Sequence, residues 1–236
     1  MKLLFVVPAY NESASLPSVV GDLRAQFPAA DVVVVNDGST DHTAEVARRL
    51  GVHLLDLPYN LGIGGAVQAG LLFADRGGYE VAVQFDGDGQ HRADQVEILL
   101  DALADRATDV AIGSRFLGAA AYSAPALRRL GILILRLASS LVAGQKITDS
   151  TSGFRAYRRT AISFLARDYP HDYPEPESVV TLCRRGYRVR EVPVLMRERK
   201  AGRSSITPHR SVYYMVKVLL SIGIGASRGT VRRPAE

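Results

Sequence analysis

Apolar and polar residues follow one another in blocks along the first half of the chain. Short runs rich in apolar residues occupy 3–9, 31–37, 52–58, 81–86 and 109–115. Such runs, which lack strict alternation, predict strands that are buried on both faces. Stretches with helical spacing separate them, at 11–27, 39–51, 62–78 and 93–105. Strands that alternate with helices predict an α/β fold with a mainly parallel central sheet flanked by helices, Rossmann-like in its N-terminal half.

Two local signals mark helix ends in this half. Asn11 and Ser13 have side chains suited to an N-cap, so we expect one of them to cap the first helix. Gly51 follows the second helical stretch, in a position where glycine commonly ends a helix. Both signals support a helix on either side of the second strand.

The alternation stops after about residue 120. A helical stretch covers 126–143, a polar loop 147–157, a helix 177–185 and a strand 187–195. A basic loop at 196–210 and a last apolar helix follow. Because no internal repeat or linker interrupts the chain, we expect one domain over 1–210, extended by an apolar helix and basic tail at 211–236.

Polar clusters follow four of the predicted strands, at the point where each strand ends. They are Pro8-Ala-Tyr-Asn-Glu12, Asn36-Asp-Gly-Ser39, Asp86-Gly-Asp-Gly-Gln90 and Gly113-Ser-Arg115. Parallel sheets with helices on both faces bind ligands outside the carboxyl ends of their strands. The repeated placement of polar residues there predicts a ligand site at this one edge.

The stretch QFDGDGQH places Asp86 and Asp88 two residues apart on a turn that glycine makes permissive. Two such carboxylates can converge on Mg²⁺ or Mn²⁺, which prefer oxygen ligands and often share them with substrate phosphates. Gln90 adds a carbonyl oxygen and His91 a polar contact. The alternative interpretation is an ordinary Asp-Gly turn, whereas an EF-hand is excluded because no glutamate stands at its twelfth position.

The other polar clusters at this edge suit a nucleotide. Asp37 has a carboxylate that can accept hydrogen bonds from a base or ribose, and Tyr10 has a ring that can stack on a nucleobase. Arg115 can neutralise phosphate. A metal, an arginine and an acidic residue that binds the nucleoside together predict a site for a nucleoside diphosphate carrying an activated group.

Composition narrows the class of protein. The chain has 236 residues and a net charge of +5, which favours anionic partners. The sequence contains no aromatic-interleaved basic motif of the kind that binds nucleic acid, so nucleic acid is not an expected partner. The single cysteine, Cys183, cannot form an internal disulfide; we interpret it as a small core residue in a protein of a reducing compartment.

Two apolar stretches leave undecided whether the protein contacts a membrane. Arg136 interrupts the first, at 130–144, and Lys217 interrupts the second, at 212–226, so neither reaches the length needed to span a bilayer. Each is either a core helix or a helix in a membrane interface. The N-terminus lacks the features of a signal peptide, so we expect a cytoplasmic protein, peripheral at the cytoplasmic face of a membrane.

Six motifs in order resemble those of the family 2 glycosyltransferases, which have the GT-A fold. They are VVPAYNE, VVNDGSTDHT, NLGIGGAVQAG, QFDGDGQH, GSRF and DSTSGFRAY, and the resemblance covers roughly residues 1–205. Within the family the chain is most similar to the dolichol-phosphate mannose synthase-like branch. That branch transfers a sugar from a nucleotide donor to a polyprenyl phosphate, so a GDP- or UDP-sugar and a dolichyl or undecaprenyl phosphate are the implied substrates.

The resemblance also implies roles for individual residues. Metal ligands are implied at Asp86, Asp88 and Gln90. Donor contacts are implied at Pro8, Tyr10, Glu12, Asp37, Asn60, Gly62 and Ser204. The implied catalytic set is Asp86, Asp88, Arg115, Asp149 and Arg199. Of these, Asp149 begins the D-x-x-S-G-F-R segment, and Arg199 and Ser204 belong to an R-x-x-G-x-S loop that closes on the phosphates.

Three features depart from the family pattern. Asn36 stands at the first acidic position of the Asp-Asp-Gly-Ser motif, and Ser205 stands where a lysine often follows the R-x-x-G-x-S serine. The C-terminal transmembrane helices of some relatives are missing. The first two departures bear on donor identity, and the third leads us to expect a small membrane partner.

The nature of the acceptor decides what the mechanism requires. The resemblance implies transfer with inversion, and a phosphate acceptor is already an anion that needs no strong general base. A hydroxyl acceptor needs a base, for which Asp149, Glu175 and Glu177 are candidates, although each is equally well interpreted as a capping or salt-bridging carboxylate. Two alternatives stay open: a transferase with a saccharide acceptor in cell-envelope polysaccharide synthesis, and a non-catalytic subunit that binds a nucleotide sugar.

Overall fold

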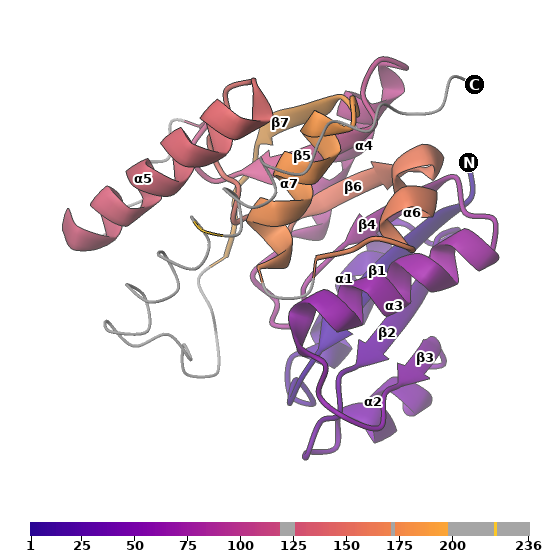
Figure 1. Ribbon diagram of the computed structural model, residues 1–236. Helices are drawn as coiled ribbons and strands as arrows, with labels where there is room; N and C mark the ends of the chain where they lie inside the picture. The colour runs from indigo at the N-terminus through magenta and orange to yellow at the C-terminus, as the bar shows by residue number, and fades with distance from the viewer. Residues whose placement is uncertain (119–125, 171–172, 198–219, 221–236) are drawn as a thin grey trace.

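The computed structural model describes residues 1–118, 126–170, 173–197 and 220. One seven-stranded sheet lies at its centre, with helices on both faces (Figure 1). The strands are β1 (Leu3–Ala9), β2 (Asp31–Asn36), β3 (His53–Asp56), β4 (Val81–Gln84), β5 (Val110–Ser114), β6 (Arg155–Arg158) and β7 (Val189–Pro193). The helices are α1 (Leu16–Gln26), α2 (Thr43–Arg49), α3 (Gly62–Arg76), α4 (Val96–Ala104), α5 (Ala126–Ala143), α6 (Arg159–Leu165) and α7 (Pro174–Arg184), and a 3₁₀ turn, η1 (Ala93–Gln95), precedes α4.

The strands lie in the order β3-β2-β1-β4-β6-β5-β7. All neighbouring pairs are parallel except those of β6, which is antiparallel to both β4 and β5. The predicted α/β fold with a mainly parallel sheet is confirmed. The polar loop predicted at 147–157 is wrong at its end, because residues from Arg155 onward form β6 with Arg155, Ala156 and Tyr157 buried.

Successive residues of the central strands serve two separate cores, as the two-residue period of a strand requires. Phe5 and Val7 of β1 face one side, where α1, α2 and α4 contribute their buried positions. Leu4 and Val6 face the other side, against α3, α6 and α7. Burial on both faces explains why these strands show no alternation of apolar and polar residues.

The first helix is capped differently from the prediction. It begins at Leu16 after Ser15, and neither Asn11 nor Ser13 caps it. Asn11 instead takes a positive φ of 57°, and its side-chain oxygen accepts a hydrogen bond from the main-chain N–H of Thr40. Gly51 does follow α2, with a φ of +63°, as predicted.

The second half of the chain packs α5 on α7. In Figure 1, α5 extends away from the sheet. No helix among the described residues is long and apolar enough to cross a membrane. The predicted boundary at 210 and the predicted apolar helix and basic tail at 211–236 lie outside the described residues, apart from Leu220.

Candidate active site

The polar clusters predicted from the sequence meet at one edge of the sheet. The parallel strands β1, β2, β4 and β5 all end there. Because β6 runs in the opposite direction, its first residue, Arg155, pairs with Gln84 at the end of β4 and with Ile112 of β5. The loop that precedes β6 therefore reaches the same edge, which brings Asp149 toward Arg115.

Hydrogen bonds join the loop after β1 to the loop after β2 and to the start of α2. The main-chain N–H of Glu12 donates to the hydroxyl oxygen of Thr43 (2.9 Å), and that of Thr40 donates to Asn11 Oδ1 (2.8 Å). Tyr10, in the first of these loops, is exposed. Its ring is thus at the surface of the edge where a nucleobase was predicted to stack.

The loop after β3 lies against the loop after β2. Asp37, which is buried, accepts a hydrogen bond at Oδ1 from the main-chain N–H of Leu61 (2.7 Å). Gly38 has a φ of +65°, and a Cβ there would lie 2.6 Å from the main-chain nitrogen of Asn60, so only glycine fits. Asn60 Oδ1 accepts from the N–H of Gly62 at the start of α3 (3.1 Å). Three predicted donor contacts therefore lie side by side.

The asparagine at position 36 has a local explanation. Its Nδ2 donates to Asp56 Oδ1 at 2.7 Å, while Arg48 pairs with the other oxygen of Asp56. An aspartate at position 36 would lack that N–H donor and would place a second carboxylate next to Asp56. Asparagine at position 36 therefore supplies the hydrogen-bond donor that Asp56, at the end of β3, accepts from.

The Asp86–Gln90 turn follows β4 and is held by main-chain contacts. The N–H of Gly87 donates to the carbonyl of Pro8 (3.3 Å), and the N–H of Gln90 donates to Asp88 Oδ1 (3.0 Å). The carbonyl of Gln90 accepts from the N–H of Arg197, four residues after β7 (2.8 Å). Two segments far apart in the sequence, at Pro8 and at Arg197, therefore converge on this turn.

The buried side chain of His91 supports the Asp86–Gln90 turn. Its ring is 3% exposed, stacks on Phe154 with centroids 4.6 Å apart, and accepts at Nδ1 from the main-chain N–H of Asp86 (2.9 Å). Burial lowers the pKa of His91 to about 4; the Asp88 charge acts against this and the Arg115 charge adds to it. His91 is therefore a neutral acceptor that fixes the main chain at Asp86, a role that sequence reasoning reduced to a polar contact.

Arg115 and Asp149 form a two-pronged ion pair. Arg115 Nε donates to Asp149 Oδ2 and Nη2 to Oδ1, each at 2.7 Å, and the main-chain N–H of Arg115 donates to Oδ2 at 3.0 Å. Nη2 also donates to the Thr151 hydroxyl oxygen (2.8 Å). Asp149 is buried, whereas the Arg115 side chain is 26% exposed. The carboxylate thus holds the guanidinium at the edge of the site.

Arg155 locks the loop before β6 to the start of α7. Its side chain is fully buried and donates to the carbonyls of Ser150, Ser152 and Glu175 and to the Ser178 hydroxyl oxygen. Burial raises the pKa of the Glu175 carboxyl, and the charge of Arg155 acts in the opposite direction. The loop carrying Asp149 is therefore fixed from inside the protein.

The chemistry of the Asp86–Asp88 turn fits a hard divalent cation. Gly153 leaves space at Asp86, because a Cβ there would lie 3.2 and 3.3 Å from the two carboxylate oxygens. Within the described residues, no three His, Cys, Asp or Glu side chains are grouped to hold a metal ion. A cation at this turn would take its other ligands from a substrate diphosphate and water, as Mg²⁺ commonly does.

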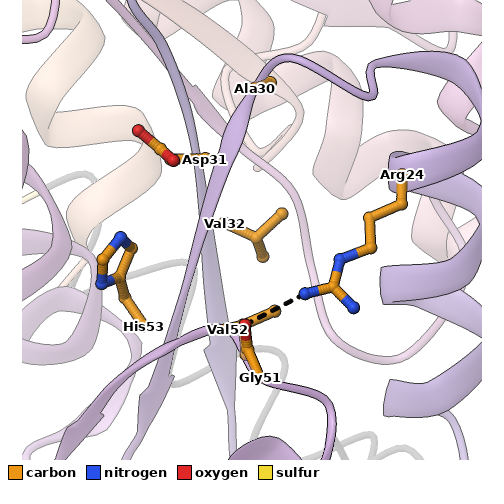
Figure 2. A pocket seen from close by; sticks show the side chains of 7 residues that line it. All are labelled: Arg24, Ala30, Asp31, Val32, Gly51, Val52 and His53. Atoms are coloured by element: carbon orange, nitrogen blue, oxygen red, sulfur yellow. Dashed lines mark hydrogen bonds between the residues drawn. The ribbon is translucent and has the colours of Figure 1, made fainter.

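A hollow of about 200 Å³ lies elsewhere on the molecule, near the starts of β2 and β3 (Figure 2). It is lined by Arg24, Ala30, Asp31, Val32, Gly51, Val52 and His53. Arg24 Nη2 donates to the carbonyl of Gly51 there (3.1 Å), which is the dashed line in Figure 2. Because parallel strands begin at the edge opposite to the one where they end, this hollow is separate from the candidate site.

Two predicted site residues, Arg199 and Ser204, lie outside the described residues. Sequence reasoning also missed Glu191 of β7, which accepts hydrogen bonds from Thr148 and Asp149. A glutamate with Val189 and Pro193 two positions to either side, and thus on one face of a predicted strand, was the available signal. It did not show which loop the carboxylate would meet.

Comparison with known proteins identifies the family. Residues 4–165 match the model for glycosyl transferase family 2. The chain is 34% identical over 216 residues to an undecaprenyl-phosphate mannosyltransferase of Micrococcus luteus, a match that covers 88% of each protein. It is 32% identical over 244 residues to a polyprenol monophosphomannose synthase of Mycolicibacterium smegmatis, covering 98% of this chain and 92% of that protein.

A solved structure shows the same fold. Glucosyl-3-phosphoglycerate synthase from Mycobacterium tuberculosis, in complex with Mn²⁺, uridine-diphosphate-glucose and phosphoglyceric acid, matches with a TM-score of 0.68 at 17% identity. The match covers 94% of this chain and 80% of that one. The sheet, the family match over residues 4–165 and this likeness together confirm the expected architecture. The chain belongs to glycosyl transferase family 2 and is a glycosyltransferase with the GT-A fold.

Proposed function

We propose that the protein transfers a sugar from a nucleoside diphosphate sugar to a polyprenyl phosphate, with inversion at the sugar. The observation that carries the proposal is the convergence of the Asp86–Asp88 turn and the Arg115–Asp149 pair at one sheet edge. The printed names of the two relatives, a mannosyltransferase and a mannose synthase for polyprenyl phosphates, support the same acceptor.

The donor's nucleoside is assigned to the loops after β1, β2 and β3. Tyr10 would stack on the base, and Glu12, Asp37, Asn60 and Pro8 would line the nucleoside. Their loops are tied together by the hydrogen bonds described above, so the surface is largely formed before the donor arrives. This arrangement suits either a GDP- or a UDP-sugar.

The diphosphate is assigned to Asp86, Asp88 and Arg115, with Gln90, Arg199 and Ser204 as further contacts. Asp86 and Asp88 would hold Mg²⁺ or Mn²⁺, which when bound supplies positive charge to the leaving diphosphate. Arg115, aimed by Asp149, adds a fixed charge at the same place. Charge that builds on the leaving group is thereby stabilised by groups already in position.

The reaction forms one bond to the anomeric carbon and breaks another. An oxygen of the acceptor phosphate attacks the anomeric carbon, the bond from that carbon to the diphosphate oxygen breaks, and the nucleoside diphosphate leaves with the electron pair. The acceptor phosphate is an anion at neutral pH, so no proton has to be removed. Arg115 engages both oxygens of Asp149, which argues against Asp149 as the general base that a hydroxyl acceptor would need.

Because the acceptor has a lipid tail, the protein has to reach a membrane surface, and α5 is the helix that suits this contact. Leu133, Leu137 and Leu141 recur every four residues along α5, and their side chains are 48%, 61% and 83% exposed. Such a stripe on one helix face is typical of a helix that lies in a membrane interface. We assign α5 to peripheral contact at the cytoplasmic face of the membrane that holds the polyprenyl phosphate.

A panel assay tests the transfer. The purified protein is incubated with Mg²⁺ or Mn²⁺ and GDP- or UDP-sugars, with and without a short polyprenyl phosphate, and nucleoside diphosphate release is followed. We expect acceptor-dependent release from one donor, lost in Asp88→Ala and kept in Asp101→Ala, which removes an exposed carboxylate of α4. Release that requires a saccharide instead would indicate a saccharide acceptor. Donor binding without release would indicate a subunit that only binds the nucleotide sugar.

Sedimentation with liposomes tests the membrane assignment. We expect the protein to sediment with anionic liposomes and Leu137→Glu to stay in the supernatant. Gln26→Glu adds the same charge on the exposed surface of α1 and should bind as the wild type does. Binding of the purified chain alone would make a small membrane partner unnecessary, whereas equal binding of Leu137→Glu would remove α5 from the proposal.

A further inference from the structure

Glu191 stands on β7, the last strand of the sheet beyond β5. It pairs in register with Ile112 of β5, three residues before Arg115. The main chain of β7 thus follows the same strand that delivers Arg115 to the site. The Glu191 side chain is half-buried, on an edge strand whose neighbouring residue Arg190 is exposed.

The carboxylate of Glu191 holds the loop that carries Asp149. Its Oε1 accepts from the main-chain N–H of Asp149 (2.7 Å). Its Oε2 accepts from the main-chain N–H of Thr148 (2.6 Å) and from the Thr148 hydroxyl (2.8 Å). A carboxylate that receives three donors at these distances makes strong, charge-assisted hydrogen bonds.

Glu191 therefore contacts the main chain of Asp149, the residue whose carboxylate orients Arg115. It fixes the main chain of Asp149, and the Asp149 side chain fixes both Nε and Nη2 of Arg115. Within the described part of the chain, Glu191 has no ion-pair partner of its own. Its carboxylate binds the loop instead, and the loop in turn determines where the Arg115 guanidinium points.

We propose that Glu191 is a positioning residue for Arg115, acting through Asp149. The proposal rests on the proposed function, since it takes Arg115 to contact the donor diphosphate. Groups that stabilise a leaving diphosphate must stand close to their final place before the reaction, because a small displacement costs much of their effect. Glu191 supplies that support from outside the site.

Glu191→Gln is the informative variant. Gln keeps the size and one acceptor oxygen, but it presents an NH₂ group to one of the two main-chain N–H donors. Arg190→Gln is the matched control, because it changes the neighbouring exposed residue of the same strand. The variants are compared by calorimetric binding of Mn²⁺ with UDP or GDP, by kcat and KM for the donor, and by thermal unfolding.

We expect Glu191→Gln to weaken nucleotide binding about fivefold and to lower kcat about tenfold, with the Arg190→Gln control within twofold of the wild type. Asp149→Asn combined with Glu191→Gln should be no slower than Asp149→Asn alone, because both act through one side chain. A double variant that multiplies the two losses would overturn the route through Asp149.

A purely structural role would look different. Glu191→Gln would then unfold at a lower temperature but bind nucleotide and turn over as the wild type does, and this result overturns the proposal. A wild type that binds nucleotide yet transfers sugar to no acceptor would overturn the proposed function instead. Nucleotide binding by Glu191→Gln would then decide the role of Glu191 without reference to turnover.

Discussion

Gly153 lies directly against the carboxylate of Asp86. A Cβ at position 153 would stand 3.2 Å from Asp86 Oδ2, 3.3 Å from Oδ1 and 3.0 Å from Nε2 of the buried Gln84. The loop before β6 thus passes the end of β4 without a side chain between them. The space beside this carboxylate exists because β6 runs antiparallel to β4 and brings its leading loop to the site.

Gly153→Ala tests that space. The added methyl group should push the Asp86 carboxylate aside by a few tenths of an ångström, and we expect metal-dependent transfer to fall about tenfold. Gly21→Ala is the control: no atom lies within 4 Å of a Cβ there, and alanine inside α1 should stabilise the protein by about 0.5–1 kcal/mol. Equal activity of the two variants would show that Asp86 does not need this space.

Arg115→Lys keeps the charge but loses the two-pronged geometry. An ammonium group cannot make the paired contacts that Nε and Nη2 make with Asp149, so we expect kcat to fall about a hundredfold. Steady-state kinetics measure this. Arg185→Lys, which alters an exposed pair with Asp168, should keep full activity. A lysine variant as fast as the wild type would mean that charge alone suffices at this position.

Cys183 on α7 should resist alkylation in the folded protein. Burial raises the pKa of its thiol to about 12, and the thiolate is the form that reacts with iodoacetamide. At pH 8 we expect a rate on the order of a thousandfold below that of an ordinary cysteine. The same reaction in guanidinium chloride should run at the ordinary rate, and rapid labelling of the folded protein would contradict the prediction.

Asp41 should make stability depend on pH in the acid range. Burial raises its pKa, but hydrogen bonds from the hydroxyl and N–H groups of Ser13 and Thr43 outweigh this, leaving a pKa of about 2 instead of 3.8. A carboxyl with a lowered folded-state pKa stabilises the protein above pH 4 and loses that contribution as the pH falls toward 2. Because the side chain is partly exposed, we expect about 1 kcal/mol at neutral pH.

Urea unfolding of Asp41→Asn at two pH values measures this contribution. The gap in unfolding free energy between wild type and variant should be roughly half as large at pH 3 as at pH 5.5. Asp101→Asn, at an exposed position of α4, should show no such change. A gap that stays constant between the two pH values would mean that the hydrogen bonds at Asp41 do not favour its ionised form.

Several residues of the candidate site could be predicted from the sequence, because their chemistry and their positions after strands pointed to the same edge of the sheet. Asp86, Asp88 and Arg115 follow strands, and the ends of parallel strands share an edge, so their meeting was predictable. His91 and Glu191 were not. Their partners are main-chain N–H groups of Asp86 and Asp149, and sequence does not show which N–H a side chain will reach.

The sequence by itself determined the order of strands and helices up to β5, the burial of the central strands on both faces and the edge at which the polar residues of the candidate site gather. These follow from local periodicity and from the rule for parallel sheets. The tertiary structure alone decided that β6 inserts antiparallel between β4 and β5, because strand order depends on packing between distant segments. That insertion sets Gly153 beside Asp86 and Asp149 beside Arg115, so the arrangement of the site is a property of the folded chain.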